Sequence, residues 1–273
     1  MDRITIATLN IAAASKERAR RVLDEWLDRS SFDVYVLTET SDGDGTKLIM
    51  SEFNRAGWAV FQRTTVPGDR GSIIVSRIKA TEATTYAVDD PAPGRSIIID
   101  LHTTPRVRLI GMYVPNRGND PSKSDRKRAF LNSWIRCLLN DRQPDVQRVL
   151  LGDLNVVPTS QRPKFLPQER FEYNWYDNIA HQIGLYDAAI KHGASGHEST
   201  WVAYTGEGYT YDHIFPEKSL IGRVVQFKYD HSTRVVGGVS DHSALILSLD
   251  LDSVDYIHRH RVLEPRQTEL FKS

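Results

Sequence analysis

The chain carries the stretch LLGDLNVVP at residues 150–158, where an apolar run ends in Gly-Asp-Leu-Asn. The run before it is typical of a strand that is buried on both faces. Asp153 and Asn155 follow two residues apart, so on an extended segment their side chains point to the same face. For this motif alone, a turn is the simpler interpretation, because both side chains readily cap their own backbone. A catalytic interpretation requires further polar groups at the same edge.

Such polar groups recur in six predicted strands, at their ends or within them. The motifs are TLNI with Asn10, VLTET with Glu39, GMYVPN with Tyr113 and Asn116, LLGDLN with Asp153 and Asn155, YTYDHIF with Asp212 and His213, and VSDHSALI with Asp241 and His242. Several carboxylates that converge on one rim repel each other unless a cation holds them. A hard divalent ion such as Mg²⁺ prefers oxygen ligands of this kind. The single cysteine, Cys137, and the histidine spacing fit no zinc motif.

The composition is that of an ordinary globular protein. Of 273 residues, 40% are hydrophobic and 26% are charged, and 35 Lys and Arg offset 35 Asp and Glu. The zero net charge argues mildly against tight nonspecific DNA binding, although it leaves room for a local basic patch. The first residues, MDRITIATLNI, contain no apolar signal segment, and no stretch is long enough to span a membrane. We therefore expect a cytoplasmic protein without membrane contact.

Strands outnumber helices in the predicted secondary structure. Strands are expected near residues 4–9, 32–40, 58–64, 71–78, 95–103, 106–115, 147–156, 209–217, 223–230 and 242–251, and helices near 15–30, 47–57, 122–143 and 169–188. Several strands are apolar at consecutive positions, so we expect a second sheet on one face and helices on the other. No Pro- or Ser-rich linker divides the chain. This predicts a single domain over residues 1–252 and a charged C-terminal tail over 253–273.

The six motifs resemble, in order and approximate spacing, those of the endonuclease/exonuclease/phosphatase superfamily, from about residue 3 to residue 250. Within it the chain looks most like exonuclease III and the apurinic/apyrimidinic endonucleases, through RPKFLPQER at 162–170 and STWVAY at 199–204. The resemblance implies a four-layer α/β/β/α sandwich of two mixed, mostly antiparallel sheets flanked by helices. It also implies an enzyme that hydrolyses phosphoesters with a metal ion and an in-line water.

The resemblance assigns roles to the residues that match the motifs. Glu39 would be the main ligand of Mg²⁺, or of Mn²⁺ in its place, and Asn10 and Asp241 would complete the metal environment. Asp153 would activate the attacking water, with Asn155 fixing the water or a phosphoryl oxygen. The resemblance also implies that His242 binds the scissile phosphate while Asp212 orients its imidazole and favours the charged form. Tyr113 and Asn116 would contact the phosphate or the leaving oxygen, and Arg95 and Trp201 would contact substrate.

The sequence differs from the repair enzymes in two features that bear on DNA binding. Thr210 stands where those enzymes usually have an arginine, and the net charge is zero. A basic cluster follows the Tyr113 motif, at Arg117, Lys123, Arg126, Lys127 and Arg128. It fits a DNA-facing patch and the solvated start of a helix about equally. Trp201 and Tyr204 fit a stacking contact with a base, and Trp201 fits a core position equally well.

Three functions remain open at this point. The first is a Mg²⁺-dependent DNA nuclease, either a 3′ exonuclease or an AP endonuclease, with DNA as its partner and a monomer as the simplest state. The second is a phosphodiesterase or phosphatase of the same superfamily that acts on a small-molecule or lipid phosphoester. The third is a non-catalytic binding module, which ranks last because every catalytic group of the motifs is intact. The motifs do not distinguish DNA from RNA, nor one metal ion from two.

Overall fold

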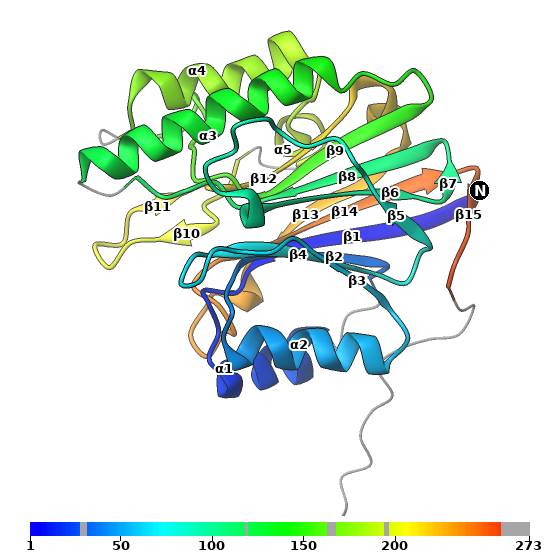
Figure 1. The fold of residues 1–273 in the computed structure, drawn as a ribbon, viewed down its shortest axis with the longest axis horizontal. Coiled ribbons are helices and arrows are strands. Elements are labelled where there is room, and N and C mark those ends of the chain that lie inside the picture. The colour runs from blue at the N-terminus through cyan, green and yellow to red at the C-terminus, as the bar shows by residue number, and fades with distance from the viewer. Residues whose placement is uncertain (28–31, 118–119, 163–167, 194–196, 258–273) are drawn as a thin grey trace, which may run out of the picture.

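The computed structural model describes residues 1–27, 32–117, 120–162, 168–193 and 197–257. Two sheets pack face to face, and helices cover the outer side of each sheet (Figure 1). Each sheet contains one parallel pair of strands, and its other neighbours are antiparallel. The four-layer α/β/β/α sandwich expected from the sequence is confirmed.

The first sheet has six strands in the order β13-β14-β1-β2-β4-β3, with β1 parallel to β2. Their bounds are β1 (Asp2–Asn10), β2 (Val34–Thr40), β3 (Ala59–Gln62), β4 (Gly71–Ser76), β13 (Val224–Asp230) and β14 (Ala244–Leu251). The helical segments α1 (Lys16–Arg21), η1 (Val22–Leu27) and α2 (Asp44–Arg55) lie below it in Figure 1. Ser15 caps α1 by accepting a hydrogen bond from the Arg18 amide, as a serine in that position commonly does.

The second sheet has five strands in the order β12-β9-β8-β6-β5, with β8 parallel to β9. Their bounds are β5 (Ala80–Glu82), β6 (Ser96–Leu101), β8 (Arg106–Met112), β9 (Val146–Asp153) and β12 (Asp212–Pro216). Its outer face is covered by α3 (Pro121–Asn140), α4 (Arg170–Asn178) and η3 (Ile179–Ile183), the continuation of α4 (Figure 1). Parallel pairing brings the carboxyl ends of β1 and β2 to one edge, and the packing of the two sheets brings the carboxyl end of β9 to the same edge.

Short elements complete the described chain. They are β7 (Thr103–Thr104) paired with β15 (Ser253–Val254), β10 (Trp201–Val202) paired with β11 (Gly208–Tyr209), helix α5 (Ala188–His192), and the 3-10 turns η2 (Pro93–Arg95), η4 (Lys218–Arg223) and η5 (His231–Thr233). The β10–β11 hairpin projects from the left of Figure 1, at the same side as the carboxyl end of β1.

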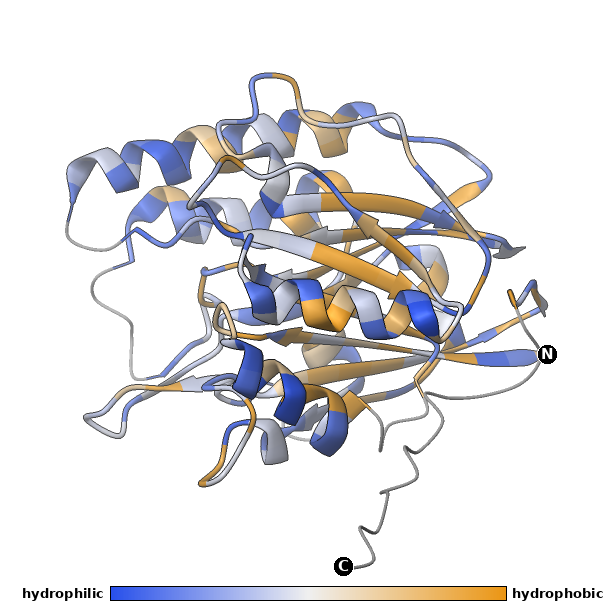
Figure 2. Ribbon diagram, turned by 60° about the horizontal axis from the view of Figure 1, so that its bottom comes forward, coloured by the Kyte–Doolittle hydropathy of each residue, from blue (hydrophilic) through white to orange (hydrophobic). Residues whose placement is uncertain are grey.

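Three apolar layers hold the sandwich together. The central layer lies between the sheets and includes Ile6, Val36 and Leu151, all without solvent exposure. One outer layer packs the second sheet on α3 and α4 through residues such as Trp134, and the other packs the first sheet on α1 and α2 through residues such as Phe53. Burying each such side chain contributes about 1.5–3 kcal/mol. Figure 2 shows the result, with apolar strands inside and helices of mixed polarity outside.

The end of the described chain stays attached to the domain. Just past the boundary expected at residue 252, β15 pairs with β7, and Tyr256 bridges to Ile78. Most of the expected tail, residues 258–273, lies outside the described residues, so the division of the chain remains a prediction. In the part of the chain that the structure describes, no helix combines the length and apolarity needed to cross a membrane.

Candidate active site

A carboxamide at the end of β1 links carboxylates from both sheets. Asn10 Nδ2 donates to Glu39 Oε2 at 3.0 Å and to Asp153 Oδ2 at 2.8 Å, while its Oδ1 accepts from the Ala12 amide at 2.7 Å. The Asn10 side chain is fully buried. The structure therefore brings together three of the residues that the sequence singled out. In this arrangement Asn10 Oδ1 accepts a hydrogen bond within the turn that follows β1, and the Asn10 side-chain NH2 group fixes the positions of the Glu39 and Asp153 carboxylates.

Glu39 owes its orientation to a bulge in β2. The register between β2 and β4 shifts at this residue, and its φ is +53°, a conformation that is costly for a residue with a side chain. Such strain persists where the surrounding structure holds it, often at functional sites. The bulge presents the half-buried Glu39 carboxylate at the rim, where Arg70 Nε lies 3.8 Å from Oε1.

The GDLN segment forms a tight turn directly after β9. Asp153 Oδ1 accepts from the Asn155 amide at 2.9 Å, and Asn155 Nδ2 donates to the Val114 carbonyl at 2.9 Å. The extended backbone expected here was wrong, because Asn155 has a φ of +49°. The two side chains still meet, with Asn155 Nδ2 at 3.3 Å from Asp153 Oδ2. At Gly152 an added Cβ would lie 2.2 Å from the Met112 carbonyl oxygen, so only glycine fits.

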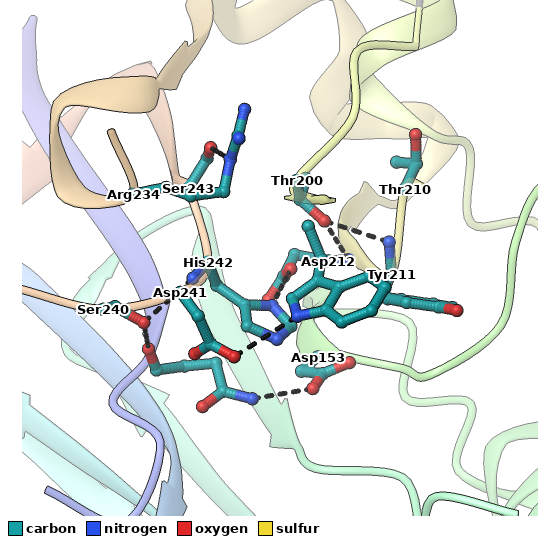
Figure 3. Close-up of polar contacts among 12 residues, drawn as sticks. Asp153, Thr200, Thr210, Tyr211, Asp212, Arg234, Ser240, Asp241, His242 and Ser243 are labelled. Carbon is teal, nitrogen blue, oxygen red and sulfur yellow. Dashed lines mark hydrogen bonds and ion pairs between the residues drawn. The ribbon is translucent and has the colours of Figure 1, made fainter. Parts of the chain in front are cut away.

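His242 and Asp212 form a buried pair beside Asp153. His242 Nδ1 lies 2.7 Å from Asp212 Oδ2, and the two side chains are 8% and 1% exposed. The His242 amide donates to Ser240 Oγ at 3.0 Å, and that hydroxyl donates to the Asn10 carbonyl at 2.5 Å. Figure 3 shows Asp153, Asp241 and His242 pointing toward one another. The histidine is thus anchored to the same strand end that orders the carboxylates.

Two pKa values in this group are displaced in directions that suit hydrolysis. Burial and then the neighbouring Asp212 raise the pKa of Asp153 to about 7, against the opposing effect of His242. Burial lowers the pKa of His242, but the Asp212 carboxylate outweighs it and raises the pKa to about 10. A carboxylate that accepts a proton near neutral pH can serve as a general base. An imidazolium beside it can stabilise negative charge on a phosphate.

Tyr113 and Arg95 lie together at the rim. Burial, and then the charges of Asp153 and Glu39, raise the pKa of Tyr113 far above its ordinary value, so the phenol keeps its proton. The Arg95 guanidinium lies 4.6 Å from the centre of the Tyr113 ring and donates to Asp69 Oδ1 at 2.6 Å. Arg95 is only 7% exposed, so it supports Tyr113 and its contact with substrate stays a prediction.

Trp201 lies over the site from the β10–β11 hairpin. Its Nε1 donates to Asp241 Oδ2 at 3.2 Å, and its ring stacks on Tyr209 with a centroid distance of 6.5 Å and an interplanar angle of 23° (Figure 3 shows the bond to Asp241). Trp201 is half-buried, and Tyr204 at the hairpin tip is fully exposed. Asn116 is exposed in the loop after β8, and its contact with phosphate also stays a prediction.

The basic cluster after the Tyr113 motif is largely neutralised. Lys127 is 2% exposed and bonded to Glu172 and to the Asn155 carbonyl, so it belongs to the interior. The remaining arginines pair with carboxylates, as Arg126 with Asp69 and both Arg117 and Arg128 with Glu169. The alternative of a DNA-facing patch is wrong for Lys127. Thr210, at the position of the expected arginine, is buried and donates to the Glu198 carbonyl at 2.8 Å.

Three residues of the site were not singled out from the sequence, although Ser240 stands in the motif VSDHSALI and Thr200 in STWVAY. Arg70 reaches Glu39 from the loop after β3, Ser240 joins His242 to Asn10, and Thr200 accepts from the Tyr211 and Asp212 amides at 3.0 and 3.2 Å. Serine, threonine and arginine are common in loops, and only the packing of distant segments reveals their partners. A motif search by strand ends therefore passes over them.

The charge balance of the site calls for a cation. Its carboxylates outnumber its cations, with Glu39, Asp153, Asp212 and Asp241 facing His242 and Arg70. Asp153, Asp212 and His242 place ligand atoms within 4.8 Å of one another, but a charged imidazolium there repels a metal ion. Oxygen donors without thiolate at the Glu39 side of the rim fit a hard divalent ion.

A family model matches most of the chain. The model of the Endonuclease/Exonuclease/phosphatase family matches residues 7–242. The chain belongs to this family. As a member of the Endonuclease/Exonuclease/phosphatase family it is an enzyme that hydrolyses phosphoesters, as the sequence predicted. No curated protein matches the chain.

Solved structures share the fold at low sequence identity. An AP endonuclease from Archaeoglobus fulgidus is 22% identical with a TM-score of 0.77, over 91% of this chain and 100% of that one. The 3′ phosphatase NExo from Neisseria, bound to a product DNA hairpin, is 22% identical with a TM-score of 0.76, over 90% of this chain and 99% of that one. An AP endonuclease from Leishmania major is 16% identical with a TM-score of 0.69, over 90% and 87%. Each of these structural similarities covers at least 90% of this chain.

Proposed function

We propose that this enzyme is a Mg²⁺-dependent nuclease that hydrolyses phosphodiester bonds of DNA. The observation that carries the proposal is the contact of Asp153 with Asn10, next to the His242–Asp212 pair, at the edge where both sheets present their strand ends. A base with a raised pKa and an imidazolium stand side by side there, which is what water attack on a phosphodiester requires. A cytoplasmic location and a monomeric state accompany the proposal as predictions.

In this proposal the chain's own residues accept the proton of the water and stabilise the negative charge on the phosphate. Asp153 accepts a proton from the attacking water, whose oxygen forms the new bond to phosphorus while the bond from phosphorus to the leaving oxygen breaks. The leaving oxygen departs as an alcohol after it takes a proton from solvent. Asn155 uses its amide hydrogens on Val114 and Asp153, so it assists the water through its Oδ1 as an acceptor. His242 donates from Nε2 to a phosphoryl oxygen, because its Nδ1 is held by Asp212. Tyr113, protonated and buried, donates to the phosphate or to the leaving oxygen.

Glu39 and Asp241 would hold the Mg²⁺ ion, and Asn10 would complete the environment by fixing the Glu39 carboxylate. When bound, the ion neutralises charge that develops on the phosphate and the leaving oxygen. Mn²⁺ shares the preference for oxygen ligands and would serve as a substitute. The assignment rests on the oxygen donors at this part of the rim and on the surplus of carboxylates there.

The aromatic hairpin supports DNA as the substrate. Trp201, Tyr209 and Tyr211 form a continuous group of rings, and Trp201 touches the site itself through Asp241. Stacking of bases on such rings contributes about 1–3 kcal/mol for each base and needs no particular sequence. Solved structures of the same fold include a 3′ phosphatase with a product DNA hairpin and two AP endonucleases, which favours the same substrate class.

The second candidate is a phosphodiesterase that acts on a small molecule or a lipid head group. The observation that favours it is the pairing of Arg95 and Arg126 with Asp69, and of Arg117 and Arg128 with Glu169. Paired arginines contribute little to the neutralisation of a DNA backbone, on which nonspecific affinity depends. The catalytic chemistry would be unchanged.

The two candidates separate in one set of cleavage assays. The substrates are a duplex with one abasic site, the intact duplex and bis-p-nitrophenyl phosphate, each with Mg²⁺ and with EDTA, and Asp153→Asn is the inactive control. The proposal predicts EDTA-sensitive cleavage of DNA by the wild type. Hydrolysis of the small ester with both duplexes untouched would contradict it and support the second candidate. If the wild type cleaves DNA, Trp201→Ala should raise KM for DNA and leave KM for the small ester unchanged. Tyr204→Ala is measured beside it.

A further inference from the structure

A second buried network lies on the other face of β12. Asp212 and His213 are neighbours on this strand, so their side chains point to opposite faces. Asp212 turns toward His242, whereas His213 turns away and is bonded at both ring nitrogens. Its Nδ1 lies 3.0 Å from Asp187 Oδ2, and its Nε2 lies 3.0 Å from the Val156 carbonyl oxygen.

The chemistry of these contacts defines the proton positions. A carbonyl oxygen only accepts, so Nε2 of His213 donates to Val156. Nδ1 faces a carboxylate and donates as well, which makes the ring an imidazolium in an ion pair with Asp187. The two side chains are 1% and 3% exposed. A charge-assisted hydrogen bond of this kind is about twice as strong as a neutral one.

Asp187 is itself fixed from several sides. Its Oδ1 accepts from the Ala189 amide at 2.9 Å, which caps α5, and its Oδ2 accepts from the Tyr176 hydroxyl at 2.8 Å. His197 Nε2 lies 3.0 Å from the same oxygen. The carboxylate is therefore a rigid anchor between α4 and α5, and it orients the ring of His213.

The other end of His213 holds the catalytic turn. Val156 follows Asn155 directly. The segment is held at two points, because the Leu154 amide donates to the carbonyl of Tyr211, the residue before β12, at 2.9 Å, and His213 in β12 donates to the Val156 carbonyl. Between these two points Asn155 adopts a φ of +49°. A left-handed residue of this type costs about 1–3 kcal/mol and persists only when its neighbours determine its position.

We propose that His213, oriented by Asp187, is a positioning residue that holds the turn of residues 153–155 in its catalytic geometry. The proposal rests on the function proposed above, since it concerns the same turn. Its consequence is catalytic as well as structural. A displacement of about 1 Å at Asp153 or Asn155 is enough to cost on the order of 100-fold in rate.

The test combines turnover with hydrogen exchange. His213→Phe keeps a planar ring and removes both bonds, His213→Gln restores one amide donor, and Tyr176→Phe is the matched control because it removes a bond to Asp187 without touching the turn. For bis-p-nitrophenyl phosphate we expect His213→Phe to lower kcat by about 10- to 100-fold with KM within about threefold. The amides of residues 154–157 should exchange about ten times faster or more, measured without substrate or metal. His213→Gln should recover part of both effects.

Tyr176→Phe should lower Tm while kcat and the exchange of residues 154–157 stay within about twofold of wild type. Unchanged kcat in a folded His213→Phe protein would overturn the proposal, whether or not the turn exchanges faster. If His213→Phe does not fold, Asp187→Asn provides the same two readings, because it removes the charge that orients His213. Should the wild type hydrolyse no phosphodiester, the proposed function fails. Exchange at residues 154–157 would then decide by itself whether His213 holds the turn.

Discussion

Replacement of Asp212 by asparagine isolates the electrostatic part of its action on His242. Asparagine keeps an oxygen that can accept from His242 Nδ1, so the ring keeps its orientation and loses only the carboxylate charge, now 2.7 Å away. That charge is the largest of the effects that raise the pKa of His242 from 6.5 to about 10 despite the burial that lowers it; the hydrogen bond to Asp212 and the charges of Asp153 and Asp241 add to it. The rise corresponds to about 5 kcal/mol in favour of the imidazolium, at about 1.4 kcal/mol for each pKa unit.

The expected effect on rate follows from the population of charged His242. In Asp212→Asn the burial remains and the largest raising charge is gone, so the pKa of His242 falls, although Asp153 and Asp241 still raise it. A fall back to the ordinary value of about 6.5 would leave about 3% of the ring charged at pH 8. A neutral ring that donates from Nδ1 presents a lone pair at Nε2 to the phosphate. We therefore expect kcat/KM at pH 8 to fall by up to about 30-fold, and the loss to shrink at pH 6, where more of the ring is charged.

The assay is the pH profile of kcat/KM for the preferred phosphodiester, together with the Mg²⁺ concentration at half-maximal rate. Glu198→Gln is the matched control, because it removes a carboxylate 2.8 Å from a different histidine, His231. It should leave the profile unchanged. A loss in Asp212→Asn that is the same at pH 6 and pH 8 would refute the electrostatic reasoning. A large rise in the Mg²⁺ requirement would instead mean that Asp212 binds the metal.

Three further predictions concern the base, the pH profile and the buried lysine. Asp153→Asn should lower kcat by about 10²- to 10⁴-fold in the rate assay, because the variant has no general base. It should also raise Tm at pH 8, as measured by calorimetry, because burial raises the pKa of Asp153 and its ionised form therefore lowers stability at that pH. Wild-type kcat/KM should rise with pH as Asp153 loses its proton near 7 and fall as His242 loses its proton near 10, so a rate that is flat from pH 5 to 9 would contradict the assignment of the base. Lys127→Met should lower the free energy of unfolding by about 3 kcal/mol in urea titration, because the buried Glu172 carboxylate loses its nearest cation and keeps only the Arg117 guanidinium, whose Nε lies 3.8 Å away.

Much of the fold was predictable because the strands carry their own pattern. The apolar run that forms β4 is buried along its whole length, and the run that forms β9 is buried at every residue except Gln147, as their sequences indicated. The two-residue strands β7, β10, β11 and β15 were not predictable, since two residues establish no period. They form because longer elements bring the segments together.

The site was predictable as a set of residues and only partly as a geometry. Asn10 and Glu39 meet because the carboxyl ends of the parallel strands β1 and β2 share an edge, and Asp153 joins them because the second sheet packs with the end of β9 against that edge. The bulge that turns Glu39 outward depends on its register with β4, and the left-handed turn at Asn155 depends on contacts with distant residues. No local pattern encodes either feature.

Lys127 is a further residue whose environment the local sequence does not predict. It stands in the charged segment SKSDRKR, which resembles a solvated helix start, yet its ammonium group is buried against Glu172, 45 residues away. Local composition describes the average environment of a segment. The position of one side chain on the helix, and the partner that α4 supplies, decide the burial of that residue.

The most direct test of the account is the metal dependence of turnover in wild type and in Glu39→Gln, on whichever phosphodiester the wild type cleaves. The account predicts that EDTA abolishes wild-type turnover, that Mg²⁺ restores it, and that Glu39→Gln needs at least about tenfold more Mg²⁺ for half its maximal rate. Full turnover in EDTA, or a Mg²⁺ requirement unchanged by the loss of the Glu39 carboxylate, would contradict it.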